Sequence, residues 1–477
     1  MGFQKQARAV FAAILFTAAC SAFGADCDDL KEMSVPGFKP NRPVGSVAWI
    51  GSTLGVTRTN IGVPAVLTRF DENLNQLGET TVSSSSVLRD LMLVSGGGEF
   101  AAVFISQSGA IIFQEINASG VRVGPEIQVG AAHGIFPNQQ FDAAYNSQLA
   151  RWEILYSIPF NINTGIWVTS IPLQSAGNGA ILDRQLEFSI GVPPLPKIAV
   201  ASDGSVAVSW FRLITEIPTY CINVYDGQYN LRKINLLSSN VQKPHLAAAA
   251  SGFALLYQAV IGGNTELRWV RTDSTGTAGA EARVVTGTGI DVVPVGILWN
   301  ATLSEWAIGY EDAYNGDSVQ DGDYRIRRLT SGGSVISDTL FTSDQVKRNI
   351  PGRYSPVWSG GAYYSSIERT PSDASGSLSY IVKHCPLGGI IAVRAAAPVP
   401  FQPFTFSAGA TGGQAPFAYA WDFGDLSAAP GQTVSHQYGK TGTYTVTLTV
   451  TDLLGDKTVK STQVVVVDNI RRRSAKK

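Results

Sequence analysis

Two carboxylates stand close together near the C-terminal end of the sequence, in Tyr-Ala-Trp-Asp-Phe-Gly-Asp. Asp422 and Asp425 flank a phenylalanine and a glycine, and Asp-Phe-Gly is also the tripeptide with which protein kinases hold magnesium. A kinase also needs a glycine-rich phosphate loop and a His-Arg-Asp catalytic loop, and the sequence has neither. Tyr419, Trp421 and Phe423 alternate as they would along one face of a strand that enters a turn. We therefore predict that this motif is structural.

The most acidic stretch begins at Glu311 and reads Glu-Asp-Ala-Tyr-Asn-Gly-Asp-Ser-Val-Gln-Asp-Gly-Asp-Tyr. Oxygen ligands in a flexible loop suit Ca²⁺. The spacing does not match an EF-hand, and a solvated acidic loop is the alternative interpretation. If calcium binds here, the candidate ligands are Asp312, Asp317, Asp321 and Asp323.

Catalytic constellations are not evident in the sequence. Its four histidines are spread over different parts of the chain without the spacing of a zinc site or of a Ser-His-Asp triad. Glycoside cleavage needs only two carboxylates, which a sequence does not reveal. The apolar segments expected to line the centre of the fold, such as Lys-Ile-Ala-Val-Ala and His-Leu-Ala-Ala-Ala-Ala, contain few acids. We predict no catalytic residue and regard enzymatic activity as the less favoured interpretation.

Composition and the N-terminus indicate an exported all-β protein. Charged residues make up 15% of the chain, and 36 basic residues balance 37 acidic ones, so the charge favours neither nucleic acid nor an anionic membrane as a partner. Residues 1–24 resemble a signal peptide of a Gram-negative bacterium, with Ala25 as the first mature residue; the alternative is a lipoprotein with lipidated Cys20. No later segment predicts a membrane span. Residues 469–477 form a basic tail.

A four-strand pattern repeats over residues 25–386 with a period on the order of 50 residues. Each unit has a short strand, a tight turn, an apolar strand, a polar loop, an alternating strand and a last strand after a Gly-rich turn, as in the stretch from Lys243 to Gly287. Such a unit is apolar on both faces and needs neighbours around an axis. The units resemble the degenerate repeats of secreted bacterial β-propellers, which implies roughly seven blades.

Residues 387–468 have a different pattern, which contains Tyr-Ala-Trp-Asp-Phe-Gly-Asp, His-Gln-Tyr and Gly-Thr-Tyr-Thr-Val-Thr-Leu-Thr-Val-Thr-Asp. They resemble a PKD domain, which implies an immunoglobulin-like β-sandwich. The family usually has glycine after its second aspartate, whereas Leu426 stands here. This departure bears on the geometry of the following turn.

Cysteine placement bears on ring closure. The last propeller unit lacks a fourth strand, and the segment Cys-Asp-Asp-Leu-Lys-Glu-Met-Ser-Val near the N-terminus supplies one in the predicted fold. Cys27 and Cys385 would then lie on adjacent strands and form a disulfide, while Cys221 is expected to be a buried free thiol.

Insertions collect in the loops between second and third strands, which emerge on one face of the predicted disc. Aromatic residues in or beside these loops are candidates for stacking on sugar rings or partner side chains: Phe160, Trp167, Tyr220, Tyr314 and Tyr324. We therefore predict a non-catalytic binding or adhesion protein that recognises an extracellular glycan or a surface protein. A polysaccharide-processing hydrolase or lyase is the alternative, and a structural surface-layer component is a third possibility.

Overall fold

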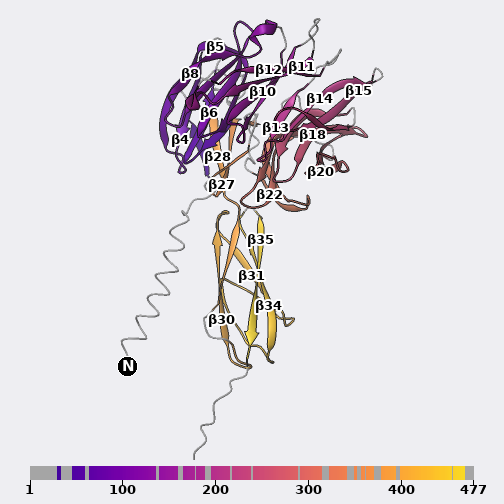
Figure 1. Cartoon of the computed structure of the whole chain (residues 1–477). Helices are drawn as coiled ribbons and strands as arrows, with labels where there is room; N and C mark the ends of the chain where they lie inside the picture. Colours follow the sequence, from indigo (N-terminus) through magenta and orange to yellow (C-terminus); the bar gives the residue numbers. More distant parts are fainter. Residues whose placement is uncertain are drawn as a thin grey trace, which may run out of the picture. The chain divides into compact units, whose positions relative to one another are not determined.

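The computed structural model describes residues 29–467 except 34–45, 60–63, 136–138, 159–164, 178, 188–194, 215–216, 238–239, 288–290, 314–321, 341–348, 352–355, 360, 370–377, 394–397 and 454. The chain divides into two compact units, one from Leu30 to Val382 and one whose described C-terminal part begins at Lys383. The regular structure described is almost entirely β, as the sequence predicts, with two single-turn 3₁₀ helices. Figure 1 labels the strands.

The first unit is a β-propeller built from antiparallel sheets, which we number I to VII. Sheets I and II share one long strand and consist of β2 (Val47–Ile50), β3 (Thr53–Arg58), β4 (Pro64–Phe70), β5 (Gln76–Gly96), β6 (Glu99–Ser106), β7 (Ile111–Asn117) and β8 (Arg122–Gln128). Sheet III consists of β9 (Phe141–Asn146), β10 (Arg151–Ile158), β11 (Gly165–Pro172) and β12 (Leu182–Glu187). Two 3₁₀ helices accompany it, η1 (Ala131–His133) and η2 (Gln174–Ala176).

The following sheets repeat the same strand order. Sheet IV consists of β13 (Lys197–Val200), β14 (Val206–Ile214), β15 (Ile217–Tyr225) and β16 (Leu231–Leu236). Sheet V consists of β17 (Gln242–Ala248), β18 (Phe253–Ile261), β19 (Asn264–Arg271) and β20 (Ala282–Thr286). Sheet VI consists of β21 (Asp291–Asn300), β22 (Glu305–Ala313), β23 (Gly322–Thr330) and β24 (Val335–Leu340). Sheet VII consists of β25 (Asn349–Pro351), β26 (Val357–Ser359), β27 (Ala362–Arg369), β28 (Leu378–His384) and β1 (Asp29–Met33).

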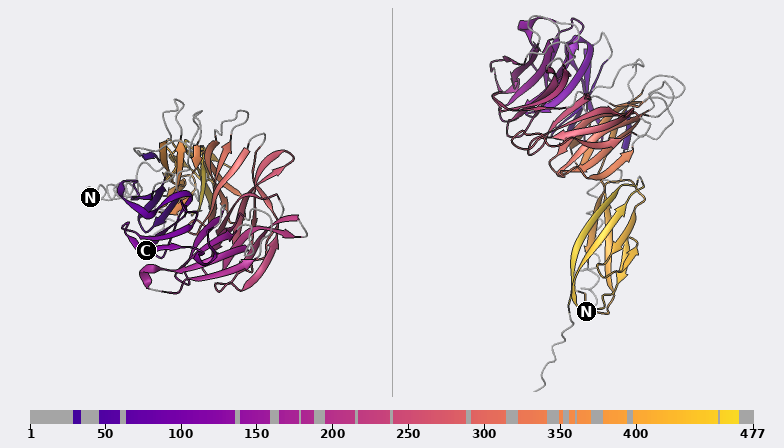
Figure 2. Two further views of the ribbon diagram at one scale, coloured as in Figure 1. Left: turned by 90° about the horizontal axis from the view of Figure 1, so that it is seen from above. Right: turned by 90° about the vertical axis from the view of Figure 1, so that its right-hand side faces the viewer.

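The sheets follow one another around a common centre, as the left panel of Figure 2 shows by their colour order. Their first strands touch in sequence, β2 with β5, β5 with β9, β9 with β13, β13 with β17 and β17 with β21. Contacts of β2 with β26 and of β23 with β25 join sheet VII to both neighbours. β1 pairs with β28, so an N-terminal strand completes the last sheet as the sequence predicts.

Burial explains the repeating sequence pattern. The second strand of a sheet is packed on both faces, so that every residue of β6 is buried. The fourth strands lie at the outer edge, and five of the six residues of β16 are exposed. Apolar second strands and polar fourth strands therefore reflect distance from the centre of the ring.

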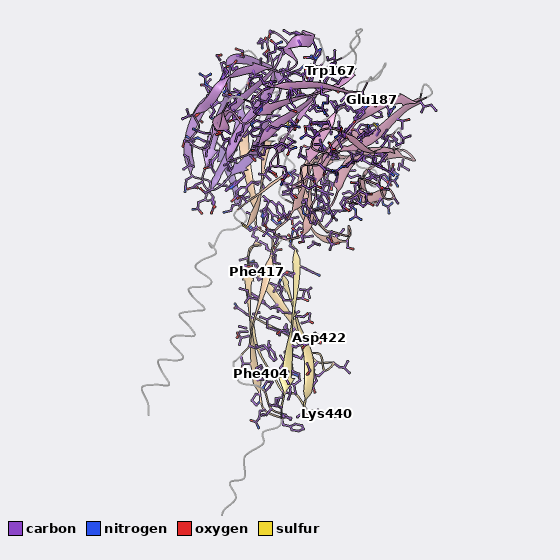
Figure 3. All side chains as sticks on the ribbon, viewed as in Figure 1. Trp167, Glu187, Phe404, Phe417, Asp422 and Lys440 are labelled. Atoms are coloured by element: carbon purple, nitrogen blue, oxygen red, sulfur yellow. The ribbon has the colours of Figure 1, made fainter. Side chains whose placement is uncertain are left out.

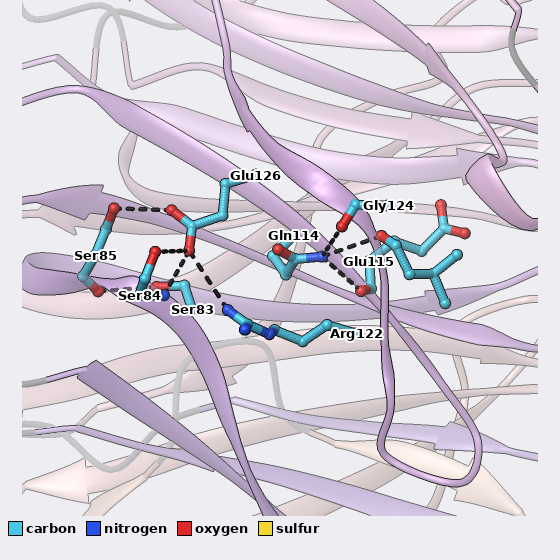
Figure 4. Close-up of polar contacts among 9 residues, drawn as sticks. Ser83, Ser84, Ser85, Gln114, Glu115, Arg122, Gly124 and Glu126 are labelled. Atoms are coloured by element: carbon cyan, nitrogen blue, oxygen red, sulfur yellow. Dashed lines mark hydrogen bonds and ion pairs between the residues drawn. The ribbon is translucent and has the colours of Figure 1, made fainter.

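The passage from sheet I to sheet II differs from the expected separate strands, because β5 runs through both sheets. Its middle is held by Glu126 of β8, whose carboxylate accepts hydrogen bonds from the hydroxyls of Ser84 and Ser85, each at 2.8 Å (Figure 4). Burial alone would raise the pKa of Glu126, but these hydrogen bonds lower it below its usual value. The charged carboxylate of Glu126 thus holds β5 where it passes from sheet I to sheet II.

The second unit is a β-sandwich. One sheet contains β29 (Gly388–Val393), β30 (Phe404–Thr411) and β33 (Thr433–His436); the other contains β31 (Ala418–Asp422), β32 (Ala428–Pro430), β34 (Gly442–Thr451) and β35 (Lys457–Val466). Trp421 and Phe423, which alternate in the sequence, are buried between them with Val446, Leu448 and Val450. These inward residues form the core of an immunoglobulin-like fold.

Candidate functional site

The acidic motif of the sandwich has a structural role. Asp422 Oδ1 accepts a hydrogen bond from the Gly424 backbone N–H at 2.9 Å. Asp425 accepts one from the Ser427 N–H at 3.1 Å and lies 2.8 Å from Nε2 of His436. Both carboxylates therefore hold the turn after β31, which is the role that the sequence predicts.

Strand register identifies the loop-rich face of the propeller. Phe141, at the start of a first strand, pairs with Tyr156 near the end of a second strand, and Asp291 likewise pairs with Ala313. The loops between second and third strands therefore leave from the face on which the first strands begin. The tight turns lie on the other face, which we call the tight-turn face. Phe160 and Tyr314 lie outside the described residues.

Trp167 lies on the loop-rich face in a polar cluster of sheet III that we call the Asp183 cluster: His133, Tyr156, Trp167, Thr169 and Asp183. The half-buried ring of Trp167 packs 3.9 Å from the imidazole of His133, centroid to centroid. Asp183 accepts hydrogen bonds from Tyr156 at 2.9 Å and Thr169 at 3.0 Å, and it lies 2.8 Å from His133 Nε2. Figure 3 labels Trp167 and Glu187 at the neighbouring ends of β11 and β12. This network fixes the position of the indole.

The physical chemistry of the cluster fits binding better than proton transfer. Burial, followed by the charge of Asp183, raises the pKa of Tyr156, so its hydroxyl stays protonated and donates to the carboxylate. Beside the cluster, Glu187 and Arg212 form an ion pair of 3.5 Å. The groups around Asp183 contact one another and hold the aromatic ring of Trp167 in a defined place, while its buried indole nitrogen has no hydrogen-bond partner among the described residues.

Tyr220 and Tyr324 do not present rings on this face. Both are fully buried. The Tyr220 hydroxyl donates to the Leu195 carbonyl at 3.1 Å, and the Tyr324 hydroxyl lies 2.7 Å from the Ser365 hydroxyl. Strand alternation turns both residues toward a neighbouring sheet, and proximity to a loop in the sequence does not reveal this direction. We therefore leave them out of the proposed binding surface.

The calcium prediction is only partly covered by the described residues. Asp312 faces Arg325, with Oδ2 and Nε 3.2 Å apart. Asp317 and Asp321 lie outside the described residues, as does the side chain of Asp323. No group of three potential metal ligands occurs among the residues that the structure describes. Calcium binding at the acidic loop stays a prediction.

A small polar cavity among the first strands was not anticipated. It has a volume of about 130 Å³ and is lined by Asp142 of β9, Lys197 of β13 and His245 of β17, together with apolar residues. Asp142 accepts a hydrogen bond from the Ile198 N–H at 2.9 Å, and its other oxygen lies 4.0 Å from the Lys197 ammonium. The sequence signals this cavity only through a polar residue near the start of each of these apolar strands.

Glu311, the first residue of the acidic stretch considered for calcium, lies on the loop-rich face near the end of β22. Burial raises its pKa to about 8, and the nearby Lys243 opposes this only in part. The raised pKa favours the protonated carboxyl group that a general acid requires. The sequence gives no indication of this, because the shift depends on packing.

Cysteine placement agrees in part with the predictions. Cys221 is a free, buried thiol, as expected, and burial raises its pKa to about 12. Cys385 is buried and directly follows β28, whereas Cys27 lies outside the described residues. The Cys27–Cys385 pair therefore stays a prediction, supported by the pairing of β1 with β28.

Comparison with known proteins identifies the second unit. Residues 390–467 match the family model of the PKD domain. No curated protein sequence matches the chain. No helix within the described ranges is long and apolar enough to cross a membrane.

Solved structures give only distant likenesses. A mutant puromycin hydrolase is 11% identical with a TM-score of 0.45, and the match covers 72% of this chain but 55% of that protein. The polysaccharide lyase Uly1 is 8% identical with a TM-score of 0.42, covering 74% of this chain and 93% of the lyase. The SapL1 lectin, solved with alpha methyl fucoside, is 11% identical with a TM-score of 0.39, covering 62% of this chain and 96% of the lectin.

Proposed function

We propose that this chain is an exported, non-catalytic binding protein that holds an extracellular glycan or a surface protein on the loop-rich face of its propeller. The observation that carries the proposal is the Asp183 cluster, in which a half-buried indole is fixed beside His133 at the base of an inserted loop. A fixed aromatic ring with a polar surround binds at a low entropic cost and is typical of recognition sites. The PKD domain would act as a spacer or an accessory binder.

The surface is tested by replacing the indole. Trp167→Ala should weaken retention of the full chain on its ligand by tenfold or more, because the fixed contact area is lost. Trp49→Ala is the matched control, since Trp49 is also half-buried but lies in sheet I beside a tight turn. Equal retention of both variants and the unchanged protein on every polysaccharide and surface protein tested would refute this binding face.

Glu311 favours one second candidate, the polysaccharide-processing enzyme. A carboxyl group with a pKa of about 8 is able to protonate a leaving oxygen at neutral pH. If this role exists, the full chain releases oligosaccharides from a polysaccharide and Glu311→Gln abolishes the release. Retention without products, equal for the unchanged protein and Glu311→Gln, would exclude it.

A further inference from the structure

A cross-strand aromatic pair beside the tight turn recurs in three sheets of the propeller. In sheets III, VI and VII the first and second strands align Tyr145 with Trp152, Trp299 with Trp306, and Trp358 with Tyr363. Their ring centroids are 4.8, 5.0 and 4.6 Å apart. The pairs therefore occupy equivalent positions in their sheets. Each lies next to the sheet that comes before its own in the chain.

At two of these places a buried carboxylate of the preceding sheet contacts the pair. Trp152 donates its indole N–H to Glu115 at 2.8 Å, and the backbone of Gln174 in η2 donates to the same carboxylate at 3.2 Å. Tyr363 donates its hydroxyl to Glu305 at 2.7 Å. Protein groups thus occupy both positions.

Between sheets V and VI the same place is open. Phe253 begins the second strand of sheet V, where Glu305 begins that of sheet VI. A cavity of about 600 Å³ lies here, which we call the V/VI cleft; its lining includes Trp299, Trp306, Phe253, Arg271, Asp273 and Thr277. The buried indole nitrogen of Trp299 has no hydrogen-bond partner among the residues that the structure describes. An unpaired buried N–H costs free energy.

The rim of the V/VI cleft carries two charged groups in fixed positions. The guanidinium of Arg271 lies 4.7 Å above the ring of Trp269 and donates to the carbonyls of Ser331 and, at 3.2 Å, Gly332 of the next sheet. Asp273 accepts hydrogen bonds from the backbone of Thr275 at 2.8 Å and Thr277 at 3.0 Å. The rim of the cleft therefore carries one positive and one negative group, and the charges of these two groups cancel.

We propose that the V/VI cleft is a binding site for a neutral pyranose unit of a glycan. The cavity lies within the range of about 300–1,000 Å³ of small-molecule sites. A pyranose has an apolar C–H face for an indole and a rim of hydroxyls for a guanidinium, a carboxylate and Thr277. The balance of Arg271 and Asp273 favours a neutral sugar. The site lies on the tight-turn face, so it is separate from the surface of the proposed function.

The test measures binding of small sugars to the full chain by calorimetry and by tryptophan fluorescence. The probes are methyl α-glucoside, methyl β-galactoside, methyl α-mannoside, N-acetylglucosamine and cellobiose, with the acyclic polyol mannitol as a chemical control. Trp299→Ala removes the stacking face. Ala250→Trp fills the mouth of the cavity from an exposed turn without changing the core. Trp358→Ala is the matched control at the equivalent pair of sheet VII.

We expect at least one sugar to bind in the micromolar to millimolar range, and mannitol not to bind. Trp299→Ala and Ala250→Trp should each weaken binding by at least tenfold, whereas Trp358→Ala and Trp167→Ala change it less than twofold. The proposal is overturned if no sugar binds, if mannitol binds equally well, or if both cleft variants keep their affinity while melting normally. A loss confined to Trp167→Ala would support the loop-rich face and overturn the cleft.

Discussion

At the scale of single residues, buried acids at equivalent positions in different sheets have different partners. Glu99 and Glu305 both begin a second strand. Glu305 meets Arg328 through two hydrogen bonds of 2.7 and 2.8 Å, whereas the partner of Glu99 is another acid, Glu115. Burial and Glu99 raise the pKa of Glu115 to about 7. The two acids are accommodated because one of them holds a proton.

Glu115 predicts a pH-dependent stability. Its pKa rises from 4.5 in the unfolded chain to about 7 in the folded protein, so its stabilising contribution is full below pH 4.5 and is lost as the pH approaches and passes 7. Glu115→Gln should flatten this fall by on the order of 1–3 kcal/mol. Thermal melting of both proteins between pH 5 and pH 9 measures it, and parallel pH profiles would contradict the assignment.

Glu305→Gln should behave differently. It leaves the Arg328 charge buried without its partner, which costs about 3–5 kcal/mol of unfolding free energy. The loss should be nearly the same from pH 5 to pH 9, because it does not depend on a proton held by an acid pair. A decrease below 1 kcal/mol would show that Arg328 reaches water in the variant.

At the scale of the element, the turn after β31 tests the departure from the PKD pattern. Leu426 occupies the position where the family usually has glycine; it is fully exposed and has a φ of 72°, which is the left-handed region. A side chain there costs about 1–2 kcal/mol. The turn nevertheless closes, with the Phe423 N–H 3.0 Å from the Ser427 carbonyl.

Leu426→Gly should therefore stabilise the sandwich. The gain is about 0.5–1 kcal/mol, because relief of strain is partly offset by the greater freedom of glycine in the unfolded chain. Leu426→Ala keeps the Cβ and serves as the control with little change. Calorimetric melting of the full chain measures the transition of the sandwich, and equal melting temperatures for the glycine and alanine variants would rule out strain at this residue.

The strands also show how much of the fold and of the candidate sites could be predicted from the sequence. Alternation of Tyr419, Trp421 and Phe423 predicted that they share one strand face, because a strand has only two faces, and Trp421 and Phe423 are buried in the sandwich core. The same logic did not place Tyr220 and Tyr324, since each blade face is covered by another sheet and both directions are buried. The small polar cavity at Asp142, Lys197 and His245 and the V/VI cleft are each lined by residues of different sheets. Their proximity is a tertiary property that local pattern does not contain.

At the scale of the whole molecule, closure of the ring is the feature on which the propeller depends. β1 comes from the N-terminal end of the propeller sequence and completes sheet VII beside β28. A Cys27–Cys385 disulfide would lock this closure and contribute about 2–5 kcal/mol. Cys385→Ser should lower the melting temperature of the propeller, and a matched reduction of the unchanged protein should do the same.

Peptide mapping without reduction checks the pairing itself. The expected product is one cross-linked fragment containing Cys27 and Cys385, with Cys221 recovered as a free thiol only after unfolding, since it is buried. A labelled, free Cys385 in the folded protein would refute the disulfide, but it would leave the pairing of β1 with β28 intact.

The central claim is that this propeller binds its ligand without transforming it. The most direct measurement incubates the protein with a panel of polysaccharides and surface proteins and records retention and released oligosaccharides in the same samples. We expect retention on at least one ligand, with no soluble products after prolonged incubation, and a loss of retention for Trp167→Ala. Release of oligosaccharides that Glu311→Gln abolishes would contradict it and establish a polysaccharide-processing enzyme instead.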